Sequence, residues 1–302
     1  MKTTATKRRR IDGVLLLDKP PGMTSNAALQ KARWLFSAAK AGHTGTLDPM
    51  ATGLLPLCFG EATKFAGELL HADKRYAATV RLGLRTDTSD AEGRVLETRP
   101  VAVTREQVAS VLARFRGEIL QVPPMHSALK RNGRPLYEYA RQGIELVRTP
   151  REVIIHSLDL RAFAGDELVF DVDCSKGTYV RTLAQDIGEA LGCGGHLTAL
   201  RRIRIGSLRL EQAVALEALA SMSPEARESL LLPADALLSS LPRLDLDGVA
   251  AQRFGHGQTL AGWGTLEGRV RVYDDGGRFL GLGHAGPDGR LAPVRLIATA
   301  PE

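Results

Sequence analysis

The chain is organised around one stretch, Gly42-His43-Thr44-Gly45-Thr46-Leu47-Asp48-Pro49-Met50-Ala51-Thr52-Gly53. Glycines, threonines and a histidine lead to a single carboxylate, which a proline follows at once and a last glycine closes. Because glycine and proline punctuate the backbone, we expect Asp48 to be held on a stiff turn. A carboxylate presented in this way can act as a nucleophile or a general base. Asp-Pro and Gly-rich runs also form ordinary turns, so local chemistry alone leaves both interpretations open.

The composition is that of a globular, mildly basic protein. With 302 residues, 44% of them hydrophobic, the chain is long enough for a buried core in one large domain or two unequal ones. Lys and Arg number 40 against 34 Asp and Glu, which gives a net charge of +6. This modest excess permits an anionic partner such as nucleic acid without requiring one.

Cysteine usage and the chain start bear on the compartment. Cys58, Cys174 and Cys193 form no CxxC pair, which argues against a disulfide framework or a structural zinc site and favours a reducing cytoplasm. No apolar run approaches the roughly 18 residues that span a bilayer. Residues 1–10 are basic and lack the apolar core of a secretory signal, so we expect a disordered, phosphate-seeking tail.

Regular elements are predicted on both sides of the Asp48 stretch. Residues 13–19 form an apolar run typical of a buried strand, and a helix capped by Thr24 or Ser25 should follow. Residues 61–70 predict a second helix. Residues 76–82 alternate as a strand, with Tyr76 on its apolar face.

A strand end and a helix start meet again later in the chain. Residues 168–174 alternate as a strand, and Thr178 is a plausible N-cap for the helix that follows. Tyr179 and Arg181 then lie near the first helical turn, where side chains commonly line pockets. A cation there is unfavourable with the helix dipole, which suggests an acidic partner such as Asp48. Surface exposure of Arg181 is the alternative.

Three further features carry a functional and a structural interpretation each. Residues 202–205 alternate Arg and Ile, which predicts a strand with a basic face that either binds phosphates or is solvated. His43 either touches a ligand or hydrogen-bonds its own loop. Lys19 follows a strand and is by default a solvated strand end.

Strands and helices do not alternate strictly, which favours an α+β fold over a doubly wound sheet. Residues 207–240 are Ala- and Leu-rich and predict helix. After residue 241, short strands separated by Asp-Gly turns predict a small β-rich domain. At about 60 residues such a domain is near the lower limit for independent stability, so we expect it to lean on the main body. The expected division is a tail at 1–10, a main domain at 11–240 and the small domain at 241–302.

Four motifs in order carry a resemblance to a known family. They are Lys19-Pro20-x-Gly22-x-Thr24-Ser25, the stretch 42–53, Arg85-Thr86-Asp87-Thr88-Ser89-Asp90 and Ser175-Lys176-Gly177-Thr178-Tyr179-Val180-Arg181. Together they resemble the bacterial tRNA pseudouridine synthase B family, which modifies uridine 55 in the T-loop of tRNA. The resemblance extends from about residue 11 to the C-terminus. The small domain resembles the family's PUA-like RNA-binding module.

The resemblance implies a catalytic domain with a mixed, largely antiparallel sheet flanked by helices. It implies that Asp48 is the catalytic carboxylate and that Arg181 pairs with it, which should keep the carboxylate ionised and lower its pKa. It also implies substrate contacts: Tyr76 at the catalytic centre stacks on the target base, Tyr179 closes over the nucleotide, His43 holds the extruded RNA, Leu200 lines the base pocket, and Lys19 supports the site or a phosphate.

The implied reaction moves the base within one nucleotide. The N-glycosidic bond breaks, the base rotates, and C5 rejoins the ribose, so the resemblance implies neither a cofactor nor a metal. Attack of Asp48 on the base, attack on the sugar and removal of a sugar proton all stay open. The base must leave its stack, and the glycines of the loop would let the RNA approach Asp48 closely. The implied protein is cytoplasmic, binds the tRNA T-arm, and needs no membrane or protein partner; it is expected to be a monomer.

Other functions are compatible with parts of the sequence. The basic tail and the PUA-like module suit an RNA-binding protein that helps tRNA fold. A base-releasing glycosidase needs a second carboxylate, for which Asp87, Asp90 and Asp173 are equal candidates. A guide-RNA-dependent relative of the same superfamily is the last alternative.

Overall fold

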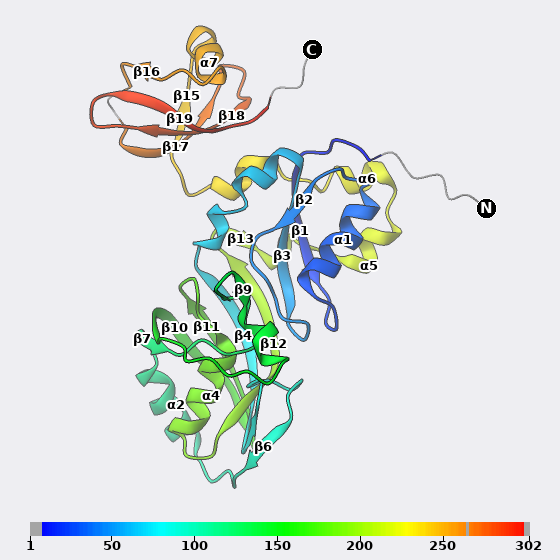
Figure 1. Cartoon of the computed structure of the whole chain (residues 1–302), viewed down its shortest axis with the longest axis vertical. Helices are drawn as coiled ribbons and strands as arrows, with labels where there is room; N and C mark the ends of the chain where they lie inside the picture. Colours follow the sequence, from blue (N-terminus) through cyan, green and yellow to red (C-terminus); the bar gives the residue numbers. More distant parts are fainter. Residues whose placement is uncertain (1–7, 264–265, 299–302) are drawn as a thin grey trace, which may run out of the picture.

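The computed structural model describes residues 8–263 and 266–298. A ten-stranded sheet extends down the length of the main body (Figure 1). Its strands are β1 (Gly13–Lys19), β2 (Ala41–His43), β3 (Thr52–Phe59), β4 (Lys74–Leu82), β7 (Gly117–Gln121), β10 (Arg151–Ala164), β11 (Glu167–Cys174), β12 (Gly195–Ile205), β13 (Leu208–Arg209) and β14 (Val214–Ala215).

The order of this sheet is β14-β1-β3-β12-β4-β11-β10-β7, with β2 beside β3 and β13 beside β12. Only the pairs β1–β14 and β3–β12 are parallel. The sheet is therefore mixed and largely antiparallel, which confirms the predicted α+β fold class. Two short ladders complete the main body: β5 (Leu84–Thr86) with β6 (Val95–Thr98), and β8 (Lys130–Arg131) with β9 (Arg134–Pro135).

Helices flank the large sheet (Figure 1). The α-helices are α1 (Ser25–Leu35), α2 (Arg105–Arg114), α3 (Leu136–Ala140), α4 (Val180–Ala190), α5 (Leu216–Ser221) and α6 (Pro224–Glu228), and the 3₁₀ segments are η1 (Gly60–Phe65), η2 (Glu68–Leu70), η3 (Leu210–Gln212) and η4 (Ala234–Leu238). Thr24 caps α1 as predicted, since its side chain accepts a hydrogen bond from the backbone N–H of Ala27 at 3.1 Å.

Three local predictions differ from the structure. Residues 61–70 form the two 3₁₀ segments η1 and η2 instead of one helix, with the poor helix former Gly67 between them. Residues 207–240 hold only short helices, because Pro224 and Pro233 cannot continue a helix and instead begin new ones. Tyr179, not Thr178, is the N-cap of α4, while the Thr178 hydroxyl donates to the carbonyl of Ser175 at 2.9 Å.

The small C-terminal sheet lies at one end of the molecule (Figure 1). It has the order β15-β17-β18-β19-β16, from β15 (Arg243–Asp245), β16 (Leu260–Ala261), β17 (Gly268–Tyr273), β18 (Phe279–Ala285) and β19 (Arg290–Leu296), with helix α7 (Gly248–Gly255). Its architecture is consistent with a PUA-like domain. Phe279 packs on Phe65 of the main body with ring centroids 5.5 Å apart, so the small domain leans on the body as expected.

The N-terminal segment is partly integrated into the fold. Residues 1–7 of the expected tail lie outside the described residues. Arg9 is not part of a free tail: its backbone N–H donates to Ser37 at 2.7 Å and its guanidinium contacts Glu228 at 2.6 Å. Within the described residues, no helix is long and apolar enough to cross a membrane.

Strand β1 explains how the core is divided. Its side chains alternate, so that Leu15 and Leu17 join one buried cluster while Val14 and Leu16 join another on the opposite face. The first cluster also holds Tyr76 and Leu200. The predicted site therefore lies on one defined face of the large sheet.

Candidate active site

The Asp48 loop is fixed at several points. The Ser25 hydroxyl accepts from the backbone N–H of Leu47 at 2.7 Å and donates to its carbonyl at 3.0 Å. The Lys19 ammonium donates to the carbonyl of Pro49 at 3.3 Å. Asp48 itself accepts, through its backbone carbonyl, the N–H of Ala51 at 3.1 Å. The loop is thus tied to β1 and α1, as the prediction of a stiff turn requires.

Lys19 has no exposed surface and lies outside the cavity. Its ammonium also donates to the carbonyls of Pro20 at 2.8 Å and Met23 at 2.7 Å. Burial lowers the pKa of Lys19 to about 8, although the Asp48 carboxylate opposes this shift. Lys19 is therefore not a solvated strand end and cannot reach a phosphate as placed; its geometry fits support of the loop.

The last glycine of the loop, Gly53, is required by the packing of the protein's own backbone. Gly53 has φ +99°, and a Cβ there would lie 2.3 Å from the carbonyl oxygen of Arg202 on the neighbouring strand β12. Only glycine meets both conditions. The expected approach of RNA is not needed to explain this residue.

Arg202 is a structural residue that the sequence did not reveal. It is 1% exposed, and its guanidinium donates to the carbonyls of Leu54 at 2.8 Å and Gly45 at 3.2 Å. The expected basic face is therefore neither solvated nor free for phosphates at this position. Its neighbours are also committed, since Arg201 pairs with Asp18 at 2.7 Å and Arg204 pairs with Asp173. Nothing in a run of arginines marks the one that is buried.

Asp48 and Arg181 form an ion pair from distant parts of the chain. The Nε of Arg181 lies 2.9 Å from Oδ2 of Asp48, and Nη1 lies 3.4 Å from the carboxylate of Asp90. The same guanidinium donates to the carbonyls of His126 at 2.7 Å and Thr88 at 3.1 Å. Arg181 is buried, so its placement on α4 is explained by these acidic and carbonyl partners rather than by surface exposure.

The pKa of the Asp48 carboxyl is raised above its ordinary value. Burial is the largest cause, the charge of Arg181 opposes it, and the nearby Asp90 adds to it. The expectation that Arg181 lowers the pKa is right for that single interaction. It is wrong for the net direction, because the loss of solvent outweighs the cation.

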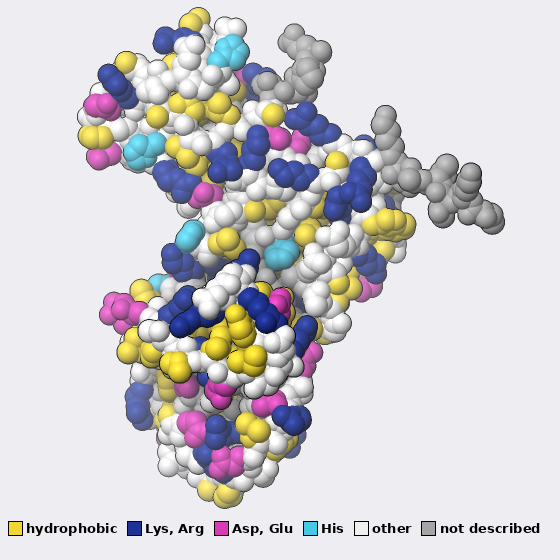
Figure 2. All heavy atoms as spheres, in the orientation of Figure 1, with side chains coloured by type: hydrophobic (Ala, Val, Ile, Leu, Met, Phe, Trp, Pro, Cys, Tyr) yellow, Lys and Arg dark blue, Asp and Glu magenta, His cyan; other side chains and the backbone are white. Residues whose placement is uncertain are grey.

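A cavity of about 870 Å³ opens over this pair. Such a volume lies in the range of small-molecule sites. On the face drawn in Figure 2, Lys and Arg side chains surround the hollowed middle of the molecule. Of the predicted site residues, the cavity brings together His43, Asp48, Tyr76, Tyr179, Arg181 and Leu200.

Tyr76 and Leu200 form an apolar wall. They lie on the adjacent strands β4 and β12, where Leu200 is paired with Ala78, two residues from Tyr76. Both are nearly buried but border the cavity. Such a wall can replace the stacking that a base loses when it leaves an RNA helix.

His43 presents an unpaired ring nitrogen. Its Nδ1 is buried and has no hydrogen-bond partner among the described residues. Burial, together with the charge of Arg202, lowers the pKa of His43, which favours the neutral ring. Among the described residues, no hydrogen bond from this nitrogen supports the alternative in which His43 holds its own loop. The residue does line the cavity.

Tyr179 is held by a residue that sequence reasoning missed. The buried Gln121 accepts the backbone N–H of Tyr179 at 3.0 Å and donates to its carbonyl at 3.3 Å. The segment between β7 and β10 also borders the cavity through His126, Tyr137 and Arg141. Neither a single glutamine nor an irregular loop has a sequence pattern from which these contacts could be predicted.

The fold and the site define a class, the pseudouridine synthases. The chain matches the models "TruB family pseudouridylate synthase (N terminal domain)" over residues 33–180, "tRNA pseudouridylate synthase B C-terminal domain" over 181–239 and "Pseudouridine synthase II TruB, C-terminal" over 242–297. A solved Cbf5-Nop10-Gar1 complex aligns with a TM-score of 0.73 at 27% identity, covering 95% of this chain and 84% of that chain. A solved H/ACA RNP bound to a substrate RNA containing 2′-deoxyuridine shares the fold, with a TM-score of 0.74 at 24% identity over 95% of this chain and 85% of that one.

Curated relatives narrow the class. A tRNA pseudouridine synthase B of Dechloromonas aromatica is 59% identical over 292 residues, covering 97% of each chain. Another, of Aromatoleum aromaticum, is 60% identical over 293 residues, covering 97% of this chain and 95% of that one. The chain therefore belongs to the tRNA pseudouridine synthase B family, which confirms the resemblance of its four motifs.

Proposed function

We propose that this protein converts uridine to pseudouridine at position 55 in the T-loop of tRNA, with Asp48 as the essential carboxylate. The observation that carries the proposal is the Asp48–Arg181 ion pair within a cavity of nucleotide size, in a chain of this family. Membership of the family supports an isomerase that acts on tRNA. To this the proposal adds the position of the uridine in the tRNA and the role of Asp48.

The geometry suits a carboxylate that must stay aimed while it reacts. Oδ2 of Asp48 contacts Nε of Arg181 at 2.9 Å, while Oδ1 lies 3.4 Å from Nη2. Oδ1 is therefore the less strongly engaged oxygen. A fixed, charge-paired carboxylate of this kind can attack the base, attack the sugar or remove a sugar proton.

Recognition of the flipped uridine falls to the cavity walls. In the proposal, Tyr76 stacks on the base, Leu200 closes the apolar wall, and Tyr179 covers the nucleotide. The neutral His43, which lines the cavity, helps to hold the RNA in its extruded form. Lys19 acts indirectly, since it ties down the loop that carries Asp48.

The rest of the molecule supplies contacts to RNA. The net charge of +6 and the Lys and Arg side chains around the hollow (Figure 2) suit recognition of a folded RNA through its phosphates. We assign the chemistry to residues 11–240 and auxiliary RNA binding to the PUA-like domain at 241–302. The proposal includes a cytoplasmic enzyme that acts as a monomer without a protein partner.

A base-releasing glycosidase fits the site less well. Asp90, a carboxylate near Asp48, is buried against Arg181 and also accepts from the hydroxyl of Thr88. Usual glycosidases instead need two carboxyl groups that flank the scissile bond. Asp90 is instead engaged with the protein itself.

The decisive experiment uses the full chain and an unmodified tRNA transcript. Pseudouridine should appear at position 55, and a transcript with cytidine at that position should remain unmodified. Asp48→Asn should lower the rate by at least about 10²-fold, the scale of a lost acid–base group, while retaining the wild-type far-UV spectrum. Full turnover by Asp48→Asn would refute the proposed role, and release of free uracil would indicate the glycosidase.

A second function is compatible with the first. The PUA-like sheet and the basic surface around the hollow suit a protein that helps tRNA fold. Such a role should survive Asp48→Asn, because it does not use the carboxylate. A tRNA-folding assay on the Asp48→Asn protein tests it, and loss of folding assistance in a well-folded variant would count against it.

A further inference from the structure

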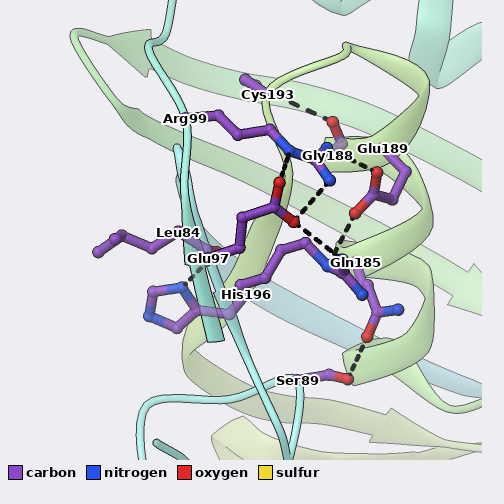
Figure 3. Close-up of polar contacts among 10 residues, drawn as sticks. Leu84, Ser89, Glu97, Arg99, Gln185, Gly188, Glu189, Cys193 and His196 are labelled. Carbon is purple, nitrogen blue, oxygen red and sulfur yellow. Dashed lines mark hydrogen bonds and ion pairs between the residues drawn. The ribbon is translucent and has the colours of Figure 1, made fainter. Parts of the chain in front are cut away.

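Side chains on one face of α4 contact the segment between β4 and α2 (Figure 3). Arg181, Gln185 and Glu189 are spaced four residues apart and therefore share this face. Glu189 contacts Arg85 at 2.9 Å and Arg99 at 2.8 Å, and both arginines also contact Glu97. One turn nearer the site, the side chain of Gln185 accepts a hydrogen bond from the hydroxyl of Ser89.

Ser89 has an unfavourable backbone conformation. Its φ is +62°, in the left-handed region that a residue with a Cβ rarely adopts. Such a conformation persists only where the surroundings hold it. Here its carbonyl accepts the N–H of Leu197 at 3.0 Å, and its nearly buried hydroxyl donates to Gln185.

The residues on both sides of Ser89 contact Arg181. The carbonyl of Thr88 lies 3.1 Å from Nη1, and the carboxylate of Asp90 lies 3.4 Å from the same atom. The φ of Ser89 therefore sets where two of the acceptors for the guanidinium lie. If the turn relaxed, Arg181 would lose the arrangement that directs its Nε toward Asp48.

The other contacts on this face are less suited to the task. The ion pairs among Arg85, Arg99, Glu97 and Glu189 form a network one helical turn farther from Arg181, and these side chains are 27% to 41% exposed. The Gln185–Ser89 bond is neutral, lies closest to Arg181, and acts on the strained residue itself.

We propose that Gln185 is a positioning residue for the reaction at Asp48: by accepting the hydroxyl of Ser89 it holds the left-handed turn that aims Arg181. This inference rests on the proposed function for its kinetic consequence. Its structural content, the placement of Arg181, does not depend on turnover.

The test compares Gln185→Leu, Ser89→Ala and Ser89→Gly in the full-length protein with unmodified tRNA. Gln185→Leu and Ser89→Ala should each lower the single-turnover rate roughly tenfold, the equivalent of one lost hydrogen bond, with little change in KM. The double variant Gln185→Leu/Ser89→Ala should be no slower than either single variant. Ser89→Gly should retain more activity than Ser89→Ala, because glycine adopts the left-handed turn without strain.

Two readouts separate positioning from general damage. In Gln185→Leu the acid limb of the rate profile should move to higher pH, since a misplaced Arg181 no longer favours the ionised Asp48. The Nε proton of Arg181, followed by NMR, should exchange with solvent faster than in wild type. The matched control is Gln30→Leu on α1, an exposed glutamine that does not line the cavity, which should leave rate and profile unchanged.

The experiments distinguish failure of the proposed function from failure of the positioning role of Gln185. A wild-type protein that makes no pseudouridine refutes the proposed function, and the Arg181 exchange measurement then still decides the positioning. Wild-type exchange of the Arg181 proton in Gln185→Leu would overturn the inference. So would Ser89→Gly and Ser89→Ala variants that lose activity equally.

Discussion

Arg181 and Asp48 meet at 2.9 Å, yet the arginine side chain is 5% exposed and the aspartate side chain 37% exposed. The cation is enclosed by protein, and the anion opens onto the cavity. Because Asp90 and two carbonyls also hold the guanidinium, Arg181 cannot follow the carboxylate if it moves. Arg181 is thus a fixed partner that holds the Asp48 carboxylate in one position.

Replacement of Arg181 should lower both the turnover rate and the stability of the protein. Arg181→Lys keeps the charge but supplies a single point donor where the guanidinium serves four acceptors, so we expect the turnover rate to fall by about 10²-fold, the scale of a misplaced catalytic group. Arg181→Met should also destabilise the fold by about 3 kcal/mol, because it leaves Asp90 as a buried charge without its partner. Single-turnover kinetics and denaturant unfolding measure the two effects. Wild-type kinetics for Arg181→Lys would show that the fork geometry is unimportant.

The raised pKa of Asp48 predicts a pH dependence. The acid limb of the rate profile should lie above the pKa of an ordinary aspartate, since the carboxylate must be ionised to react. For stability, the native state holds the Asp48 proton more tightly than the unfolded state. This contribution is complete below the unfolded pKa and is lost as the pH rises through the folded one. Asp48→Asn should therefore gain stability relative to wild type as the pH rises above about 4, the ordinary pKa of an aspartate; melting curves that keep a constant difference at every pH would contradict the shift.

Gly53 should tolerate no side chain. A Cβ there meets the carbonyl oxygen of Arg202 at 2.3 Å, so Gly53→Ala should cost more than about 2 kcal/mol by adding a clash to the left-handed penalty. The matched control is Gly192→Ala, which has φ +82° but open space around its Cβ and should cost only about 1 kcal/mol. Thermal unfolding compares the two. Equal losses would mean that the β12 backbone yields easily.

Arg201 and Arg202 form a neighbouring pair with opposite environments. Arg202→Met should destabilise by about 2–4 kcal/mol, because it leaves the carbonyls of Leu54 and Gly45 without donors inside the protein. Arg201→Met removes a partly exposed contact with Asp18 and should cost less than about 1 kcal/mol. Urea unfolding measures the free energy of unfolding of both variants. A larger loss of stability for Arg201→Met than for Arg202→Met would contradict this prediction.

Much of the fold could be predicted because its signals are local. The apolar run of β1, the alternation of β4 and β11, and the Thr24 cap each depend on residues within a few positions of one another. The 3₁₀ segments after β3 and the broken helices after β13 were less predictable. There, glycine and proline decide where a helix starts or stops, and an Ala- and Leu-rich composition does not show this.

The sequence by itself determined that Asp48 sits on a stiff turn and that Tyr179 and Arg181 begin a helix, because glycine, proline and helix periodicity act over short distances. Its ordered motifs also determined the family. Only the tertiary structure decided that Arg181 pairs with Asp48 across 133 positions, that Arg202 and Lys19 are buried, and that Gln121 and Gln185 hydrogen-bond Tyr179 and Ser89. Burial and hydrogen-bond partners arise when distant strands and helices pack together, so no local pattern records them. The direction of the Asp48 pKa shift also depends on the tertiary structure, since the effect of burial on the pKa exceeds the opposing effect of Arg181.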